Sequence, residues 1–111
     1  MRIQASRKGR RVLARLSGEL DHHGAAEIRA KLNALIADHT VSELVLDMGN
    51  VTFMDSAGLG VILGRYRDLS RRGGRLILTC VPGDIDRLFE MYGMYSLAGC
   101  GRGMLDATDT I

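Results

Sequence analysis

Residues 44–64 read LVLDMGNVTFMDSAGLGVILG, a pattern that predicts a buried strand, a loop and the start of a helix. The run Leu44-Val45-Leu46 is short, apolar and bounded by polar residues, so we expect a central strand over residues 43–48 that is covered on both faces. From Ser56 onward, apolar residues recur at helical spacing and predict a helix that ends at the Gly73-Gly74 pair. Its apolar stripe consists of Leu59, Ile62, Leu63, Tyr66 and Leu69, and its polar side of Arg65, Arg67, Asp68, Arg71 and Arg72.

The rest of the chain alternates predicted strands and helices. We expect strands near 2–6, 11–17 and 75–81 and helices near 23–38 and 84–92, the last with Ile85, Leu88, Phe89 and a possible fourth residue, Tyr92, facing inward. The order β-β-α-β-α-β-α predicts an α/β fold, with flanking helices on a mixed, mostly parallel sheet of four to five strands. We expect one domain over residues 1–111 with its core at 10–97. The Gly-rich tail, 98–111, stays open between a short strand and a helix.

The composition is that of an ordinary globular domain. Hydrophobic residues make up 46% and charged residues 25% of the 111 residues, and the formal net charge is +2. Two basic segments, Arg7-Lys8-Gly9-Arg10-Arg11 and Arg71-Arg72-Gly73-Gly74-Arg75, suit solvated turns. Because no aromatic residues interleave with their arginines, we expect no direct contact with nucleic acid.

Neither membrane attachment nor export is predicted. The apolar runs are far shorter than the roughly 20 residues of a membrane-spanning helix, and the first residues do not open a signal peptide, so we expect a cytoplasmic location. Cys80 lies in an apolar run and Cys100 in the Gly-rich tail, at a spacing that suits neither a metal site nor a disulfide framework. We expect two reduced thiols that serve only packing.

The predicted topology brings three loops together. Parallel strands end at the same edge of a sheet, which is where open α/β sheets usually place their binding sites. We therefore expect Asp21, Ser56 and the Pro82-Gly83 turn to share one rim.

The segment Asp55-Ser56-Ala57-Gly58-Leu59-Gly60 joins a strand to a helix, where a Ser or Asp oxygen can accept bonds from unpaired backbone amides. We expect Ser56 to cap the helix, and a phosphate added there would lie at the favourable end of the helix dipole. Gly58, Gly60 and Gly64 are costly in a helix, which leaves two explanations: close packing on the sheet, or access for a partner to the Ser56 hydroxyl.

The segment Asp21-His22-His23 contains metal-ligating residue types, but no third or fourth ligand is suitably spaced. We expect Asp21 to cap the following helix, His22 to contact a partner, and His39 to lie near the negative end of that helix. Neither a metal nor a cofactor is predicted.

Three segments together resemble the sporulation-type anti-sigma-factor antagonists of the STAS domain family. They are Gly18-Glu19-Leu20-Asp21-His22-His23, the stretch from Phe53 to Tyr66 with its Asp-Ser-x-Gly-Leu-Gly motif, and Arg87-Leu88-Phe89-Glu90-Met91-Tyr92-Gly93. The resemblance covers roughly residues 10–97. Ala57 stands where some relatives have a second serine, and the Gly-rich tail departs from the usual helical ending.

This resemblance implies a regulatory cycle in transcription. The unmodified protein would bind an anti-sigma factor, itself an ATP-dependent serine kinase, and so release the sigma factor. Phosphorylation of Ser56 would end this binding, and a PP2C-type phosphatase would reverse the modification. The residues that match the motif, and that we expect at the partner interface, are Asp21, His22, Asp55, Ser56, Gly58, Leu59 and Gly60.

The sequence supports two other functions less well. An enzyme such as a nucleotide hydrolase is disfavoured because the sequence has no phosphate-binding loop, metal cluster or recognisable pair of nucleophile and base. A STAS subunit of a transport or stress-signalling complex remains an alternative, since the same fold would suffice.

Overall fold

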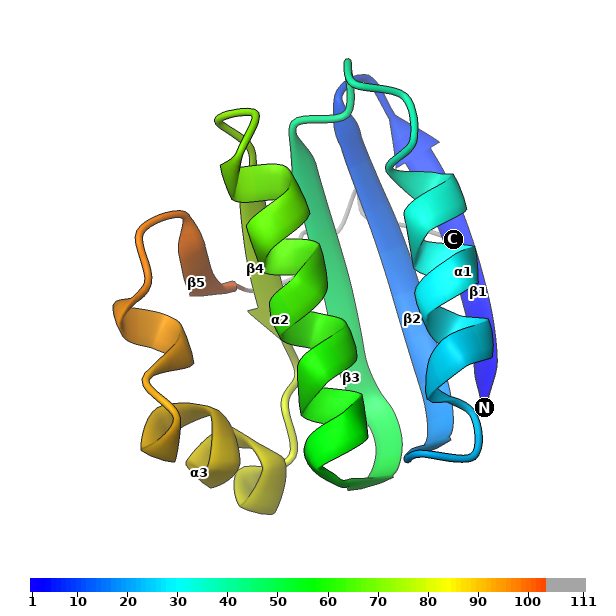
Figure 1. The fold of residues 1–111 in the computed structure, drawn as a ribbon, viewed down its shortest axis with the longest axis vertical. Helices are drawn as coiled ribbons and strands as arrows, with labels where there is room; N and C mark the ends of the chain where they lie inside the picture. The colour runs from blue at the N-terminus through cyan, green and yellow to red at the C-terminus, as the bar shows by residue number, and fades with distance from the viewer. Residues whose placement is uncertain (104–111) are drawn as a thin grey trace.

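The computed structural model describes residues 1–103 and shows a five-stranded sheet with helices α1 and α2 on one face (Figure 1). Its elements are β1 (Arg2–Lys8), β2 (Arg11–Leu20), α1 (Ala25–Leu35), β3 (Glu43–Met54), α2 (Ser56–Ser70), β4 (Arg75–Thr79), α3 (Gly83–Met91), a short 3₁₀ helix η1 (Met94–Ser96) and β5 (Cys100–Gly103). The predicted fold class and order of elements are confirmed. The tail, left open by the sequence, contributes β5, and residues 104–111 lie outside the described part.

The strands follow the order β1-β2-β3-β4-β5, with β1 antiparallel to β2 and all other neighbours parallel. In the amino-terminal hairpin, Arg2 pairs with Ser17 and Lys8 with Arg11. The start of the chain therefore lies near the carboxyl end of β2. Because β2, β3 and β4 are parallel, their carboxyl ends share one edge of the sheet, at the bottom of the view in Figure 1.

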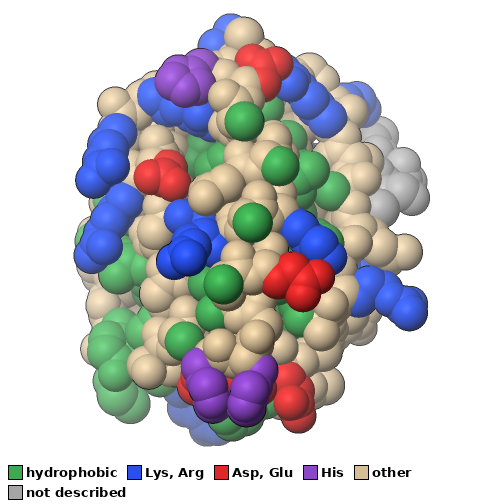
Figure 2. Space-filling view, turned by 45° about the vertical axis from the view of Figure 1, so that its right-hand side comes forward, with side chains coloured by type: hydrophobic (Ala, Val, Ile, Leu, Met, Phe, Trp, Pro, Cys, Tyr) green, Lys and Arg blue, Asp and Glu red, His purple; other side chains and the backbone are tan. Residues whose placement is uncertain are grey.

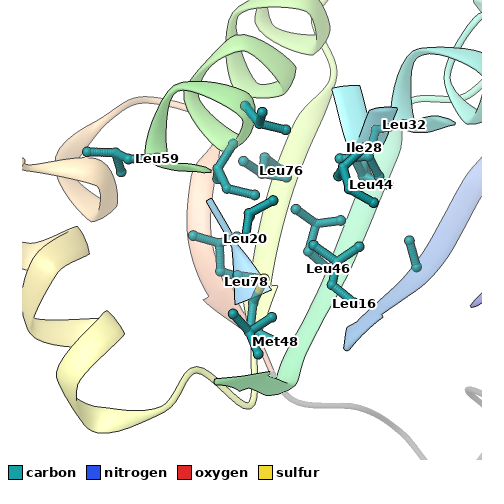
Figure 3. Close-up of a cluster of buried hydrophobic side chains, with 14 of the residues drawn as sticks. Leu16, Leu20, Ile28, Leu32, Leu44, Leu46, Met48, Leu59, Leu76 and Leu78 are labelled. Carbon is teal, nitrogen blue, oxygen red and sulfur yellow. The ribbon is translucent and has the colours of Figure 1, made fainter. Parts of the chain in front are cut away.

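The main core lies between the sheet and its helices (Figure 3). Alternate residues of each strand point to this face because side chains in a strand project to opposite sides in turn. The largest fully buried side chains of the core include Leu16 and Leu20 from β2, Ile28 and Leu32 from α1, Leu44, Leu46 and Met48 from β3, Ile62 and Leu69 from α2, and Leu76 and Leu78 from β4. At roughly 1.5–3 kcal/mol for each buried side chain, this face provides most of the drive to fold.

β2 and β3 are longer than their apolar runs predict. The sequence indicated strands ending at residues 17 and 48, but the parallel pairing continues to Leu20 and Met54. Register shifts accommodate Gly18 and the polar Gly49-Asn50 pair, which interrupt the apolar pattern without ending the strands. The extension matters for the site, because Asp21 and Asp55 directly follow the paired residues Leu20 and Met54.

Three side chains, those of Arg65, Tyr92 and Cys80, depart from the sequence-based predictions. Arg65, expected on the polar side of α2, is only 5% exposed, because it lies between two helices and donates to the Arg29 carbonyl of α1. Tyr92, considered for the inner face of α3, follows the helix and is 62% exposed. Cys80 is exposed because β4 ends at Thr79, one residue before it, whereas Cys100 is buried as expected. His39 lies four residues beyond the last residue of α1, beside Ile36 and Ala37 at the far end of that helix.

Candidate functional site

The loops that follow β2, β3 and β4 lie at the same end of the molecule (Figure 1). Asp21 begins the first loop, Ser56 is the first residue of α2, and Pro82 precedes α3. The Pro82-Gly83 pair differs from the predicted turn, since Pro82 is the N-cap of α3 and Gly83 its first helical residue. Hydrogen bonds between the first two loops make Asp21 and Ser56 part of one surface, which we call the Ser56 rim.

The Asp55 carboxylate joins these two loops. Its Oδ1 accepts a hydrogen bond from the Gly58 amide at 3.0 Å, which caps α2. Its Oδ2 accepts from the His22 amide at 3.0 Å and lies 3.1 Å from His22 Nδ1. The hydrogen bond from the Gly58 amide is the main reason that the pKa of Asp55 falls from 3.8 to about 2. Partial desolvation of the carboxylate opposes this shift, and the two bonds from His22 add to it. Asp55 is thus ionised at neutral pH.

Ser56 is not the helix cap that the sequence suggested. Asp55 occupies the capping position because its carboxylate reaches the Gly58 amide, and Ser56 is therefore the first residue inside the helix. The Ser56 side chain is exposed, and its hydroxyl makes no hydrogen bond within residues 1–103. A hydroxyl in this position is available to an incoming reagent without breaking any contact of the fold.

Asp21 shapes the neighbouring loop instead of capping α1. Its Oδ1 accepts hydrogen bonds from the amides of His23 at 3.0 Å and Gly24 at 3.4 Å, which closes a turn before the helix. Gly24 is the N-cap of α1 and provides no side-chain bond. The rings of His22 and His23 contact each other with centroids 4.0 Å apart, and both are exposed.

Metal binding finds no support at the rim. Throughout the described part of the chain, no three His, Cys, Asp or Glu side chains are grouped so that they could hold a metal ion. No helix of that part is long and apolar enough to cross a bilayer. The rim presents the exposed Ser56 hydroxyl, two carboxylates and two imidazoles, a set suited to contact with another macromolecule.

The family follows from sequence comparison. A model of the STAS domain matches residues 2–101. This chain belongs to the STAS domain family. It is 40% identical to an anti-sigma F factor antagonist of Paenibacillus polymyxa over 86 residues, which are 78% of this chain and 74% of the relative. It is also 40% identical to the anti-sigma F factor antagonist of Lysinibacillus sphaericus over 98 residues, 88% of this chain and 79% of that protein.

Solved structures agree with this assignment. The unphosphorylated form of the anti-sigma factor antagonist SpoIIAA superposes on this STAS domain with a TM-score of 0.72 at 35% identity, covering 96% of this chain and 90% of the other. The phosphorylated form of SpoIIAA from Bacillus gives a TM-score of 0.74 at 32% identity, with 92% and 91% covered. The fold of this STAS domain is therefore that of a known antagonist in both states.

The three glycines in α2 of this STAS domain differ in how closely other atoms surround them. A Cβ on Gly58 would lie 2.1 Å from the Leu20 carbonyl oxygen, so the packing of α2 against β2 requires this glycine. A Cβ on Gly60 or Gly64 would meet nothing within 4 Å, and neither has a positive φ. Close packing thus explains Gly58 but leaves Gly60 and Gly64 unexplained by the fold.

The predicted interface residues also divide by exposure. His22, Ser56 and Gly60 are exposed, and Asp21 and Asp55 are partly so. Gly58 and Leu59 are buried, Leu59 being 8% exposed, so they hold α2 on the sheet and do not present a contact surface. The bond between His22 and Asp55 had no distinct signal in the sequence, because it depends on how far β2 and β3 extend.

Proposed function

We propose that this STAS domain is an anti-sigma-factor antagonist that Ser56 phosphorylation switches off. In this proposal the unphosphorylated protein binds an anti-sigma factor that is also an ATP-dependent serine kinase, and the sigma factor is released. A PP2C-type phosphatase restores the binding form. The observation that carries the proposal is the exposed Ser56 hydroxyl, which is unbonded within residues 1–103 and lies beside a loop that Asp55 holds in place. The names of the relatives support the class of partner.

The position of Ser56 lets the fold tolerate a phosphate. The group would add about −1.5 to −2 charges at the amino end of α2, where the helix dipole favours anions by about 0.3–1 kcal/mol. The ionised Asp55 opposes it from the preceding residue. The two effects have opposite signs, and within residues 1–103 Ser56 makes no hydrogen bond that the modification would break. We therefore expect little change in folding stability.

The bound partner experiences a much larger effect. A kinase must bring the hydroxyl against the terminal phosphate of ATP, so after transfer the phosphoserine faces the remaining nucleotide phosphates. Like charges in a desolvated interface cost several kcal/mol, and each 1.4 kcal/mol is a tenfold change in affinity. Release of the phosphorylated antagonist then requires no refolding of either protein.

The test uses two variants of the complete chain and the anti-sigma factor kinase from the same organism, identified by affinity capture. Ser56→Asp should weaken binding, measured by calorimetry, by at least about tenfold while the Tm stays nearly unchanged. Ser56→Ala should bind as the wild type does but accept no phosphate from the kinase and ATP. Equal affinity of the wild type and Ser56→Asp, or phosphorylation at another residue, would contradict the proposal.

A further inference from the structure

The two basic segments of the sequence meet at the end of the molecule opposite the Ser56 rim. The Ser42 amide donates to the Arg10 carbonyl at 2.8 Å, and the Ser42 carbonyl accepts from the Arg75 amide at 2.8 Å. Arg72 reaches the same loop, with Nη2 donating to the Val41 carbonyl at 3.1 Å. These residues precede or begin β2, β3 and β4, so they gather at the amino edge of the parallel strands.

Positive charge is concentrated at this end. Seven Lys and Arg lie here against three Asp and Glu, an excess of four positive charges in a chain whose formal net charge is only +2. The seven are Arg7, Lys8, Arg10, Arg11, Arg71, Arg72 and Arg75, and the three are Asp38, Glu43 and Asp68. Asp38 and Glu43 pair with Arg7 and Arg11 at 2.8 and 3.1 Å, which leaves the second basic segment largely uncompensated.

A groove opens between the carboxyl-terminal ends of α1 and α2 at this end of the molecule. It encloses about 480 Å³ and is lined by Arg71, Arg72, His39 and Asp68, with Ile36 among its apolar residues. Figure 2 shows histidine side chains at opposite ends of this face, with Lys and Arg side chains beside the upper one. The volume lies within the usual range of small-molecule pockets, about 300–1,000 Å³.

The contacts around the groove leave two guanidinium groups available. Asp68 is engaged by the buried Arg65, whose Nη2 lies 3.3 Å away, and approaches Arg71 only at 4.0 Å. The Arg71 side chain is 78% exposed. Arg72 is anchored through Nη2, and its buried Nε has no hydrogen-bond partner within the described residues. A buried donor without a hydrogen-bond partner is unfavourable in a fold.

Helix capping accounts for only part of this arrangement. The helix dipole stabilises a cation near the carboxyl end of a helix, and Arg72 already donates to a loop carbonyl there. The two helix ends together contribute about one negative charge, and Asp68 another. The positive charge of Arg65, Arg71 and Arg72 is larger than this negative charge, and the neighbouring Arg75 adds one more positive charge.

We infer that this groove binds a phosphate-bearing small molecule, with phosphate oxygens bridging Arg71 and Arg72. Arginine suits the role because its planar guanidinium donates paired hydrogen bonds to phosphate oxygens. The site lies at the opposite end from Ser56 and does not depend on phosphorylation of that residue.

The test is an NMR titration of the complete chain with pyrophosphate and, separately, with ATP, at about 150 mM salt to screen nonspecific attraction. We expect saturable shifts of the Arg71, Arg72 and His39 amides. Arg71→Gln should weaken binding at least fivefold, and the Arg71→Gln/Arg72→Gln pair should abolish it. The control pair Arg29→Gln/Arg87→Gln removes the same charge elsewhere and should leave the affinity unchanged.

The outcomes separate the possible ligands. If pyrophosphate and ATP bind with equal affinity, the groove recognises only the phosphates. If ATP binds more tightly, the protein also contacts the nucleoside. Both outcomes support the site. Equal weakening by the control pair, shifts scattered over the surface, or no saturable binding of either pyrophosphate or ATP would overturn it. Because Arg71 is exposed, its single variant remains informative even if loss of Arg72 disturbs the fold.

Discussion

Asp55 is the residue on which the Ser56 rim depends. One carboxylate closes the first turn of α2 through Gly58 and fastens the loop of Asp21 through His22. Because its two oxygens serve different elements, any change that neutralises or shortens this side chain loosens both. The Ser56 hydroxyl, which makes no bond in the described chain, owes its position to this neighbour.

The pH dependence of stability tests this role. The pKa of Asp55 in the fold, about 2, is below its ordinary value of 3.8, so the fold favours the ionised form. Its stabilising contribution is present above about pH 4 and is lost as the pH falls toward 2. Asp55→Asn should lower the Tm at pH 7 and give a shallower decline between pH 4 and 2.

The matched variant for this measurement is Asp84→Asn, which removes an exposed carboxylate in the first turn of α3. It should retain the decline of the wild type. Some decline remains in Asp55→Asn as well, because Arg7 and Thr40 lower the pKa of Asp38. Curves of equal slope for the wild type and Asp55→Asn would contradict the role given to Asp55.

At the scale of elements, α2 has one face fixed by packing and another left open. Gly58 lets the helix approach β2 closely. Gly60 and Gly64 have free space around them, so the fold does not require glycine at these two positions. Two helical glycines cost about 0.8–1 kcal/mol each relative to Ala. A partner that approaches this face closely gives a reason to keep them.

Alanine substitutions distinguish the two faces of α2. Gly58→Ala should destabilise the protein by about 1–3 kcal/mol, because the new Cβ would overlap the Leu20 carbonyl. Gly60→Ala should raise stability by up to about 1 kcal/mol and weaken binding of the proposed kinase partner severalfold. Urea unfolding and calorimetry give the two quantities. If Gly60→Ala raised stability without weakening binding, the partner would not approach this face.

β5 is held by a cluster of side chains on α3 and η1. Arg102 forms ion pairs with Asp86 at 3.2 Å and with Glu90, and its guanidinium lies 4.0 Å from the ring centroid of Tyr95. Tyr95 in turn donates to Asp86 at 2.5 Å. Because β5 is a four-residue edge strand, these contacts supplement the few backbone bonds it makes to β4.

Removing Arg102 should therefore loosen β5 locally. In Arg102→Ala we expect faster hydrogen exchange of amides in β5 and at its junction with β4, with little change in the global unfolding midpoint. Arg87→Ala, which removes an exposed arginine of α3, should leave exchange unchanged. Unaltered exchange in Arg102→Ala would show that backbone pairing alone holds this strand.

At the scale of the whole molecule, the net charge is small enough for one phosphate to cancel it. The formal charge is +2 and the isoelectric point about 8.8. A phosphate adds about −1.5 to −2 charges, so the phosphorylated form should focus near neutral pH. Native isoelectric focusing after incubation with the kinase and ATP should show a second, more acidic band that is absent for Ser56→Ala. A third band would indicate another modified residue.

The sequence predicted the order of elements and the shared edge of Asp21 and Ser56, because both follow from apolar periodicity and from the parallel topology. It missed the ends of β2 and β3, since Gly18 and Gly49-Asn50 hide a pairing that depends on the neighbouring strand. It also assigned the cap of α2 to Ser56 when Asp55 provides it, because Asp and Ser are equally good capping residues. Burial of Arg65 required knowledge of where α1 crosses α2.

Because β1 runs antiparallel to β2, the chain starts beside the surface proposed for docking. Met1 lines a hollow together with Glu19, Asp21 and His23, and its Cα would lie 3.4 Å from a Cβ on Gly18. An affinity tag or fluorescent reporter fused to Met1 would begin beside Asp21, on the Ser56 rim, and would obstruct the approach of a kinase to Ser56. Labels for interaction studies are better attached at the exposed Gly9 turn, at the other end of the hairpin.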